Sequence, residues 1–379
     1  MDLVAGRAIS AERRPLRHVD PVLLLVTFGL IAIGLVMIYS AGRASLLAQH
    51  LDPSLFLKKQ AFFAGLGALL VVAAASFDYR FLKVYAGLVY VASLVLLVLV
   101  RTPLGANIRG SQRWFQVLGF QFAPSELAKV ALIAMLAAFL SEVRTTDLSL
   151  EDVFRATAIG ALPGSLVFLQ PDLGTSIVLA AILVGVLVVG GARARHLAIL
   201  ALTACVLMFG AFQLGVVKDY QVARLQSWLD PTNDPQRSDY NKQQAEIAIG
   251  SGGMLGRGYL HGTQTNLDFV PEQHTDFIFT VVGEEFGFAG AMSVLVLFAL
   301  LIWRAYRIAV LSKDPFGTYV AAGIASMFAI QVFVNVGMTL GIMPITGIPL
   351  PFVSYGGSSL LTNCLAVGLL LNIHMRRLA

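Results

Sequence analysis

The chain has 379 residues, of which 57% are hydrophobic and only 13% are charged, and its formal net charge is +5. An average soluble domain carries about 25% charged residues, so this composition excludes a soluble globular enzyme, a disordered chain and a secreted disulfide scaffold. We therefore expect a polytopic membrane protein, in which each retained polar residue needs a reason.

The apolar residues are gathered in long uninterrupted runs. A bilayer core takes roughly 20 apolar residues of helix, and these continuous Leu, Val and Ala runs are unlike the alternating strands of a barrel. We therefore expect an all-α polytopic integral membrane protein, a single domain over residues 1–379. Its ten transmembrane helices should lie near 21–40, 61–77, 84–101, 124–141, 154–170, 173–191, 197–217, 276–303, 317–341 and 358–375.

The basic residues follow the topology of such a chain. With the tail of residues 1–20 in the cytoplasm, 15 of the 27 Lys and Arg fall on the inner side and six in the short outer loops. An excess of positive charge on the cytoplasmic side sets membrane orientation. We therefore expect both termini to be cytoplasmic and no nucleic-acid partner. Cys205 and Cys364 lie within predicted spans and form neither a disulfide framework nor a metal-ligand spacing.

The first polar motif is GANIRGSQRWFQVLGF, in a short outer loop. It carries Arg109, Arg113 and Trp114, with no carboxylate between Arg101 and Phe122. Arginine forks match phosphate oxygens, and tryptophan sits well at the headgroup level. The motif therefore indicates either contact with ordinary lipid headgroups or a specific polyprenyl-pyrophosphate site.

The next motif, PSELAK, opens the span near 124–141. Pro124 suits the first turn of a helix, and Glu126 and Lys129 stand three residues apart on one face. An ion pair between them would relieve both burial penalties. The pair is either a structural staple or the polar floor of an outward-facing site.

QPDLGTS follows at an outer turn, where Asp172 precedes a helix. A carboxylate at a helix start is favoured by the dipole, so N-capping alone explains this residue. A catalytic or ligand-binding role is the competing interpretation.

Residues 218–275 form the one large extracytoplasmic loop, between the seventh and eighth spans. Long loops in compact proteins are usually functional, and this one can cover the outer mouth of the bundle. The stretch QQAEIAIG predicts a short amphipathic helix, and GSGGMLGRG predicts a flexible glycine cluster. No strand precedes the glycines, so they are not a dinucleotide site.

The loop re-enters the bilayer at LDFVPEQHTDFIFTVVGEEFGF. Glu272, His274 and Asp276 cluster within five residues, and Asp276 is expected to open a helix. A carboxylate at an outer, semi-buried surface can act as a general base. Glu284 and Glu285 are adjacent, so they point about 100° apart on a helix and form no dyad. We expect them to be buried and hydrogen-bonded to neighbouring helices.

The last motif is NVGMTLGIMPITGIPLPFVSYGGSS, which includes Ser354. Its three prolines, Pro344, Pro349 and Pro351, forbid a regular helix. Irregular backbone at membrane depth is tolerated only where protein or a cavity surrounds it. This re-entrant segment is therefore expected to line the same site as Asp276.

These motifs together resemble the SEDS family (shape, elongation, division and sporulation proteins). The resemblance runs from the first helix to the C-terminus and is most specific in PEQHTDFIF and PLPFVSYGGSS, with QPDLGTS and PSELAK in the expected order. Within the family, the last two outer motifs look more like the elongation branch (RodA type) than the division branch (FtsW type).

The resemblance implies a peptidoglycan glycosyltransferase with ten transmembrane helices in the bacterial cytoplasmic membrane, polymerising lipid II on its outer face. The family's proposed catalytic aspartate falls on Asp276, its Glu/Lys pair on Glu126 and Lys129, and its other sensitive aspartate on Asp172. The family's outer-loop Arg–Trp region falls on Arg109, Arg113 and Trp114. The implied partner is a class B penicillin-binding protein, which would cross-link the new strands.

The expected chemistry is an inverting transfer, with Asp276 as the base and the lipid-linked glycan strand as the donor. The departing pyrophosphate would be held by Arg109 and Arg113 with Arg224 or Arg257, alone or with a divalent cation (Mg²⁺ or Mn²⁺). Glu272, His274 and Ser354 complete the candidate site. Two rivals stay open: a lipid II flippase, which makes no bond, and a non-catalytic scaffold that recruits cell-wall enzymes.

Overall fold

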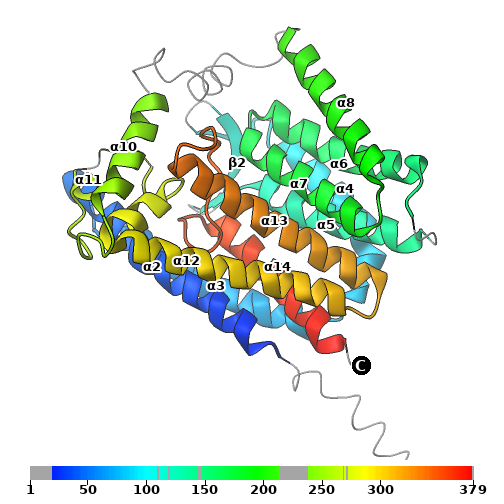
Figure 1. Cartoon of the computed structure of the whole chain (residues 1–379), viewed down its shortest axis with the longest axis horizontal. Helices are drawn as coiled ribbons and strands as arrows, with labels where there is room; N and C mark the ends of the chain where they lie inside the picture. Colours follow the sequence, from blue (N-terminus) through cyan, green and yellow to red (C-terminus); the bar gives the residue numbers. More distant parts are fainter. Residues whose placement is uncertain are drawn as a thin grey trace, which may run out of the picture.

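A computed structural model of the chain describes residues 19–108, 111–117, 120–143, 147–213, 238–267, 269 and 272–377. In these residues the fold is a bundle of long helices with a small sheet at one end (Figure 1). The bundle consists of α2 (Pro21–Ala48), α3 (Leu55–Ser76), α4 (Arg80–Leu99), α5 (Pro124–Glu142), α6 (Leu150–Leu169), α7 (Leu173–Val189), α8 (Ala194–Gln213), α12 (Ile278–Leu311), α13 (Pro315–Thr339) and α14 (Gly357–Arg376). The all-α polytopic fold class is therefore confirmed.

All ten predicted apolar segments coincide with helices. Eight helices in the described part of the chain are long and apolar enough to cross a membrane, and α7 and the apolar part of α8 are shorter apolar helices. Several helices continue past their apolar run: α2 ends at Ala48, and α3 begins at Leu55. How many of the ten cross the bilayer stays a prediction.

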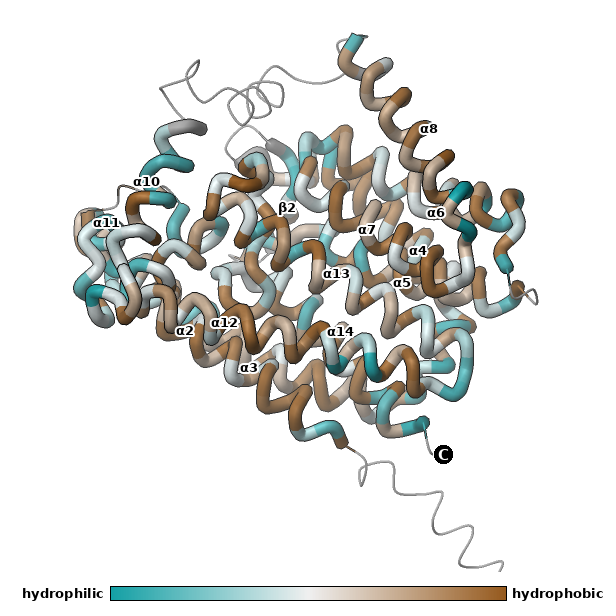
Figure 2. Tube along the Cα trace, viewed as in Figure 1, coloured by the Kyte–Doolittle hydropathy of each residue, from teal (hydrophilic) through white to brown (hydrophobic). Residues whose placement is uncertain are grey.

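The bundle has two ends, because short turns join most successive helices and reverse the chain direction (Figure 1). We call the terminal end the one where α2 begins and α14 ends, and the loop end the opposite one, which holds the sheet, α10 (Ser238–Ser251) and α11 (Thr263–Asn266). Figure 2 shows hydrophobic residues along the bundle helices and hydrophilic ones at their ends and on α10. The described residues thus begin and end on the same side of the bundle. This agrees with the prediction that both termini lie on the same side of the membrane.

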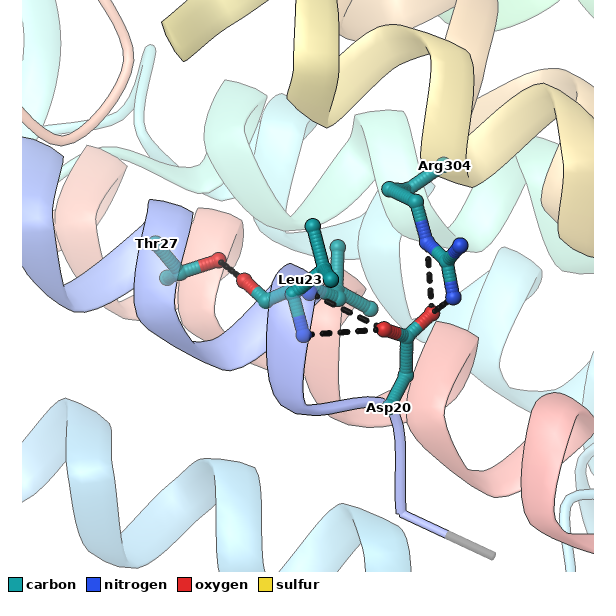
Figure 3. A network of polar contacts seen from close by, with 5 residues as sticks. Asp20, Leu23, Thr27 and Arg304 are labelled. Carbon is teal, nitrogen blue, oxygen red and sulfur yellow. Dashed lines mark hydrogen bonds and ion pairs between the residues drawn. The ribbon is translucent and has the colours of Figure 1, made fainter.

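At the terminal end, a buried carboxylate joins the first helix to α12 (Figure 3). Asp20 is fully buried, and its Oδ1 accepts hydrogen bonds at 3.1 Å from the backbone N–H groups of both Val22 and Leu23, which caps α2. Its Oδ2 accepts from both Nε, at 2.8 Å, and Nη2 of Arg304. One side chain therefore both starts α2 and pairs with a charge on a distant helix.

Two more polar pairs close the same end. The Tyr79 hydroxyl, just before α4, donates to Asp314, which caps α13. Arg376 at the end of α14 forms an ion pair with Asp78 at 3.2 Å. With the Asp20 pair, these contacts tie together the terminal ends of α2, α4, α12, α13 and α14.

The helices differ in how much of their surface the protein covers. Helices α5, α13 and α14 are mostly buried, whereas most residues of α3 and α4 are partly buried or exposed. Leu69, Val84 and Leu88 are examples of exposed large apolar side chains on these two helices. In a membrane protein such a surface is the one that contacts lipid, so α5, α13 and α14 form the core that positions the site.

A three-stranded antiparallel sheet at the loop end was not predicted. Its strands are β1 (Ala106–Ile108), β2 (Ser111–Val117) and β3 (Phe120–Phe122), in the order β1-β2-β3. Two of the strands have three residues, too short for an alternating pattern to stand out. Ser358 at the start of α14 donates to the Gln121 carbonyl at 3.0 Å, which holds β3 against the bundle.

The predicted short helix of the large loop is confirmed by α10, whose Ala245 and Ala248 are buried. Residues 218–237 of that loop lie outside the described residues.

The prediction of a flexible glycine cluster is wrong. We call residues 252–258 the glycine turn; it packs against a break in α12 at Gly287, whose φ is +64°. A left-handed residue interrupts the helical hydrogen bonds, and the turn supplies replacements: the Phe288 N–H donates to the Gly253 carbonyl at 2.9 Å. Glycine is needed at 252 and 256 because a Cβ on either residue would lie 2.0–2.1 Å from a backbone carbonyl oxygen of α12.

Candidate functional site

Asp276 lies at the loop end in the turn that precedes α12. The helix begins at Ile278, so the expectation that Asp276 opens it is off by two residues. The Asp276 N–H donates to the Glu272 carbonyl at 3.2 Å, and Glu272 has a left-handed φ of +56°. The Asp276 side chain is half-buried, an environment in which a carboxylate can meet both protein and an entering ligand.

His274 contributes to the packing of this turn. Its ring stacks on Phe56 of α3 with centroids 4.4 Å apart, and Tyr355 lies beside both rings. The Tyr355 N–H donates to the His274 carbonyl at 2.9 Å. The predicted cluster of Glu272, His274 and Asp276 is therefore one ordered turn, fixed to α3 and to the segment before α14.

We call residues 343–356 the proline segment; it runs between α13 and α14 without helix. It passes directly beside Asp276, because a Cβ placed on Gly347 would lie 3.4 Å from Asp276 Oδ2. Gly347 has a φ of +74°, in the left-handed region. The segment therefore lies against Asp276, as expected, and that the two line one functional site stays a prediction.

Ser354 has a local role in that segment. Its hydroxyl oxygen accepts from the Leu350 N–H at 2.8 Å, and its carbonyl accepts from Gln60 of α3 at 3.2 Å. The Gln60 side chain also accepts from the Gly356 N–H at 3.2 Å. These bonds hold the backbone of the proline segment, so the structure gives Ser354 a positioning role.

Asp172 has the N-capping role that the sequence predicted and also faces a cation, while a catalytic or ligand-binding role stays a prediction. Its Oδ1 accepts from the Thr175 N–H at 3.1 Å, which caps α7, and also lies 3.6 Å from Arg113 Nη1. The Arg113 guanidinium lies 5.5 Å from the Trp114 ring centroid. The ion pair joins the sheet to α7 and places a cation next to Asp172, the second carboxylate at the loop end.

Asp172 and Asp276 are linked through the proline segment. Gly174, in the first turn of α7, packs so closely on Ile348 that a Cβ there would lie 2.6 Å from its side chain. Gly347, beside Ile348, lies against Asp276. The structure therefore places the two carboxyl-bearing turns on either side of residues 346–348.

Glu126 and Lys129 form the predicted ion pair, with Lys129 Nζ 2.8 Å from Glu126 Oε2. Both residues are buried, and Pro124 is the first residue of α5, as expected. The Ala123 N–H, one residue before the helix, donates to Ser358 at 3.2 Å. A buried pair of this kind fits a structural staple and a polar floor equally.

Arg257 serves the glycine turn. Its Nε donates to the Ser251 carbonyl at 3.1 Å, and its backbone N–H donates to the Glu284 carbonyl at 3.0 Å. Arg109 and Arg224, the other two arginines predicted to hold pyrophosphate, lie outside the described residues.

Glu284 and Glu285 are buried and hydrogen-bonded, as expected, but mostly to the large loop rather than to other helices. Glu284 accepts from the Gln264 N–H at 2.8 Å and from the Thr265 N–H and hydroxyl at 3.0 and 2.7 Å. Glu285 accepts from Ser40 of α2 and from the Leu260 N–H. Both carboxyl groups therefore fasten the loop to α12.

The described residues include no group of three or more His, Cys, Asp and Glu side chains that could hold a metal ion. The donor set in this part of the chain therefore does not make a cage for a divalent cation, and the chemistry below uses none.

Sequence reasoning missed two amides that hold the site, Gln60 and Asn335. Asn335 is fully buried in α13 and donates to the carbonyls of Asp276 and Ile348. Each amide is a single uncharged polar residue in an apolar helix, which gives a weak signal by itself. The prolines of residues 344–351 indicate backbone that needs side-chain partners, but the sequence does not show which amides supply them.

The chain matches known proteins over nearly its whole length. The sequence model of the cell cycle protein family FtsW/RodA/SpoVE matches residues 21–378. Stage V sporulation protein E of Bacillus subtilis (strain 168) is 39% identical over 357 residues, which cover 93% of this chain and 96% of that protein. Peptidoglycan glycosyltransferase MrdB of Escherichia coli (strain K12) is 38% identical over 362 residues, covering 95% and 94%.

A solved structure shows the same fold. It is described as the structural coordination of polymerization and crosslinking by a peptidoglycan synthase complex, and one of its chains matches with a TM-score of 0.80 and 34% identity. The match covers 95% of this chain and 98% of that one.

Proposed function

The chain belongs to the FtsW/RodA/SpoVE family of cell cycle proteins, and from this premise we propose that it is a peptidoglycan glycosyltransferase that polymerises lipid II. The observation that carries the proposal is the half-buried Asp276 carboxylate, whose Oδ2 would lie only 3.4 Å from a Cβ placed on Gly347 of the proline segment. A relative 38% identical to the chain bears the name peptidoglycan glycosyltransferase.

In the proposed reaction, Asp276 accepts the proton of the 4-hydroxyl of the acceptor's GlcNAc. The freed oxygen attacks the anomeric carbon of the growing strand and forms the β-1,4 bond. The bond from that carbon to the pyrophosphate oxygen breaks, and polyprenyl pyrophosphate leaves with the electron pair. Direct displacement inverts the carbon and needs one base and no protein nucleophile. The phosphoanhydride-activated donor supplies the driving force, so no nucleotide is required.

Arg113 is the described residue best placed to stabilise the leaving pyrophosphate. It stands at the loop end beside Trp114 and 3.6 Å from Asp172, which keeps its guanidinium there before substrate arrives. A guanidinium can exchange one oxyanion partner for another and binds phosphate oxygens bidentately. We propose that Arg109 and Arg224 add charge to this site and that Arg257 acts through the glycine turn.

We further propose that the loop end faces away from the cytoplasm, in the cytoplasmic membrane of a bacterium, and that the protein works in cell elongation. The positive-inside bias supports the orientation, and the resemblance of the last two motifs to the elongation branch supports the role. A related chain is part of a peptidoglycan synthase complex that couples polymerization to crosslinking. This supports a class B penicillin-binding protein as the partner.

The terminal end argues against a flippase. A flippase must open a polar path to both sides of the membrane, and here Asp20–Arg304, Tyr79–Asp314 and Asp78–Arg376 tie the helices together on one side. A scaffold, in turn, has no use for a half-buried carboxylate that lies against the proline segment. Both observations favour polymerisation at the loop end.

The test is polymer formation from lipid II by the purified chain, with and without its partner, read on a gel. We expect polymer from the wild type and none from Asp276→Asn, which should keep its fold because an amide has the shape of a carboxylate. Movement of lipid II between leaflets without polymer would instead support a flippase, and neither activity would support a scaffold.

Asp52→Asn is the matched control for that test. Asp52 is a carboxylate at the same end of the bundle but is exposed, and hydrogen bonds from Lys58 and Ser54 hold its pKa well below the usual range. It is therefore ionised throughout any practical assay range, yet lies outside the site. We expect this variant to polymerise as the wild type does; full activity in Asp276→Asn would sink the assignment of the base.

A further inference from the structure

Asn335 joins two segments that are distant in the sequence. It lies one turn before the end of α13 and is fully buried. Its Nδ2 donates to the Asp276 carbonyl at 2.9 Å and to the Ile348 carbonyl at 2.7 Å. A side-chain amide nitrogen has two hydrogens, so this one group serves both carbonyls at once.

Both carbonyls belong to irregular backbone. Asp276 precedes α12, and Ile348 lies in the proline segment, so neither carbonyl is inside a helix. An unpaired buried carbonyl costs about 1–3 kcal/mol, and in a membrane no bulk water is at hand to replace the partner. The Asn335 amide therefore helps to fix the position of these two segments relative to each other, together with the hydrogen bond from the Tyr355 N–H to the His274 carbonyl.

The same contact fixes the surroundings of the Asp276 carboxylate. Gly347, the neighbour of Ile348, lies against Asp276 Oδ2. Once the backbones at 276 and 348 are held by one amide, the separation between this carboxylate and Gly347 is set as well. Ile348 also packs on Gly174 at the start of α7, so the clamp extends to the turn that carries Asp172.

We propose that Asn335 is a positioning residue for the general base, and that its amide clamp holds Asp276 at the proline segment in the geometry that the acceptor hydroxyl requires. The proposal rests on the proposed function. Asn335 touches the backbone of Asp276 rather than the reacting atoms, so its substitution should change the rate of the chemical step more than the binding of substrate.

The variant that tests the clamp is Asn335→Leu, which is close in size and has no donor. A displacement of about 1 Å can cost roughly 100-fold in rate, so we expect kcat for polymerisation to fall between about tenfold and 100-fold. The KM for lipid II should change far less. Asn335→Asp keeps the shape of the side chain and can donate at most one hydrogen bond. Its kcat should therefore lie between those of the wild type and of Asn335→Leu.

Gln331→Leu is the matched control. Gln331 is also a buried amide, one turn earlier on the same helix, and no bond joins it to either segment among those described here. We expect it to retain the wild-type kcat. A loss equal to that of Asn335→Leu would mean that any buried amide of α13 matters equally and would overturn the proposal.

Hydrogen–deuterium exchange gives a readout that does not need activity. In Asn335→Leu the backbone amides of 272–280 and of 343–350 should both exchange faster, whereas in Gln331→Leu neither should change. Unchanged exchange in both segments, or faster exchange with an unchanged kcat, contradicts the proposal. A wild type that makes no polymer contradicts the proposed function instead. The exchange experiment then still tests whether Asn335 holds the two backbone segments together.

Discussion

The two ends of the bundle use polar side chains in different ways. At the terminal end, charged and hydroxyl groups pair with one another across helices, as in Asp20 with Arg304 and Tyr79 with Asp314. The loop end also has ion pairs, Arg113–Asp172 and Glu126–Lys129, but there uncharged groups such as Asn335 and Gln60 hold irregular backbone as well. Side chains that pair hold helices together, whereas side chains that bind backbone hold a turn and its carboxylate in place. Substitutions at the terminal end should therefore lower stability without changing the reaction, whereas substitutions at the loop end can change the reaction as well.

The largest expected effect on stability is at the buried ion pair of α5, Glu126–Lys129. This pair tests the comparison between the two ends because it is a charged pair at the loop end. Lys129→Met would leave Glu126 buried without its 2.8 Å partner. Breaking a buried pair costs about 3–5 kcal/mol, and we expect the free energy of unfolding in a detergent titration to fall by that amount.

The double variant Glu126→Gln/Lys129→Met is the control. It removes both charges and should regain most of the lost stability, since no charge is left unpaired. Polymer formation by the double variant then separates the two roles: recovered activity makes the pair a staple, and activity that stays lost makes it part of the site. A Lys129→Met variant as stable as the wild type would contradict the first prediction.

The Glu284 carboxylate should have the next largest effect. It accepts from the backbone N–H groups of Gln264 and Thr265, and hydrogen bonds to a charged group contribute about 1.5–3 kcal/mol. We expect Glu284→Gln to lower stability by about that much and to speed proteolysis between residues 252 and 266. Glu246→Gln, an exposed glutamate on α10, should do neither; equal cleavage of the two variants would show that Glu284 does not fasten the loop.

Asp20→Asn tests the terminal end. The amide oxygen can still cap α2, but the charge that pairs with Arg304 is gone, so we expect a loss of about 1–3 kcal/mol and full polymerase activity per folded molecule. Asp147→Asn removes an exposed pair with Arg193 at 3.0 Å and should cost about 0–1 kcal/mol. A folded Asp20→Asn variant without polymerase activity would contradict the claim that the reaction depends on the loop end and not on the terminal end.

The smallest effect is expected at Asp172, where a cap and a charge can be separated. Asp172→Ala loses the bond to the Thr175 N–H, and such a cap contributes about 1 kcal/mol. Asp172→Asn keeps a capping oxygen but loses the charge facing Arg113. Thermal unfolding should distinguish the two variants, because only Asp172→Ala loses the cap, and the polymerisation rate should be reduced in both. A wild-type rate in Asp172→Asn would mean that Asp172 acts only as the cap of α7.

Much of the fold could be predicted from the sequence because apolar runs and capping residues are local signals. Pro124 at the start of α5 and Asp172 before α7 are read from neighbouring residues, and the Glu126–Lys129 pair from helical spacing. The absence of helix in the proline segment was predicted from its three prolines. These features depend on contacts within a few residues of one another.

What the sequence did not reveal depends on contacts between distant segments. The glycine turn was expected to be flexible because its partner, the break at Gly287, is about 30 residues away and is itself set by tertiary packing. The Asn335 clamp joins α13 to a turn 59 residues earlier in the chain. Spacing along the chain cannot show such pairings. A polar residue isolated in an apolar helix indicates that it has a polar partner but does not identify that partner.

The most direct test of the account measures two variants in one preparation series. Asp276→Asn and Asp20→Asn are purified in the same detergent, and each is assayed for its initial rate of lipid II polymerisation and its thermal unfolding midpoint. We predict that Asp276→Asn unfolds as the wild type does and makes no polymer, while Asp20→Asn unfolds at a lower temperature and polymerises at the wild-type rate. Polymerisation by Asp276→Asn at the wild-type rate would contradict the claim that the loop end, through this carboxylate, carries the reaction.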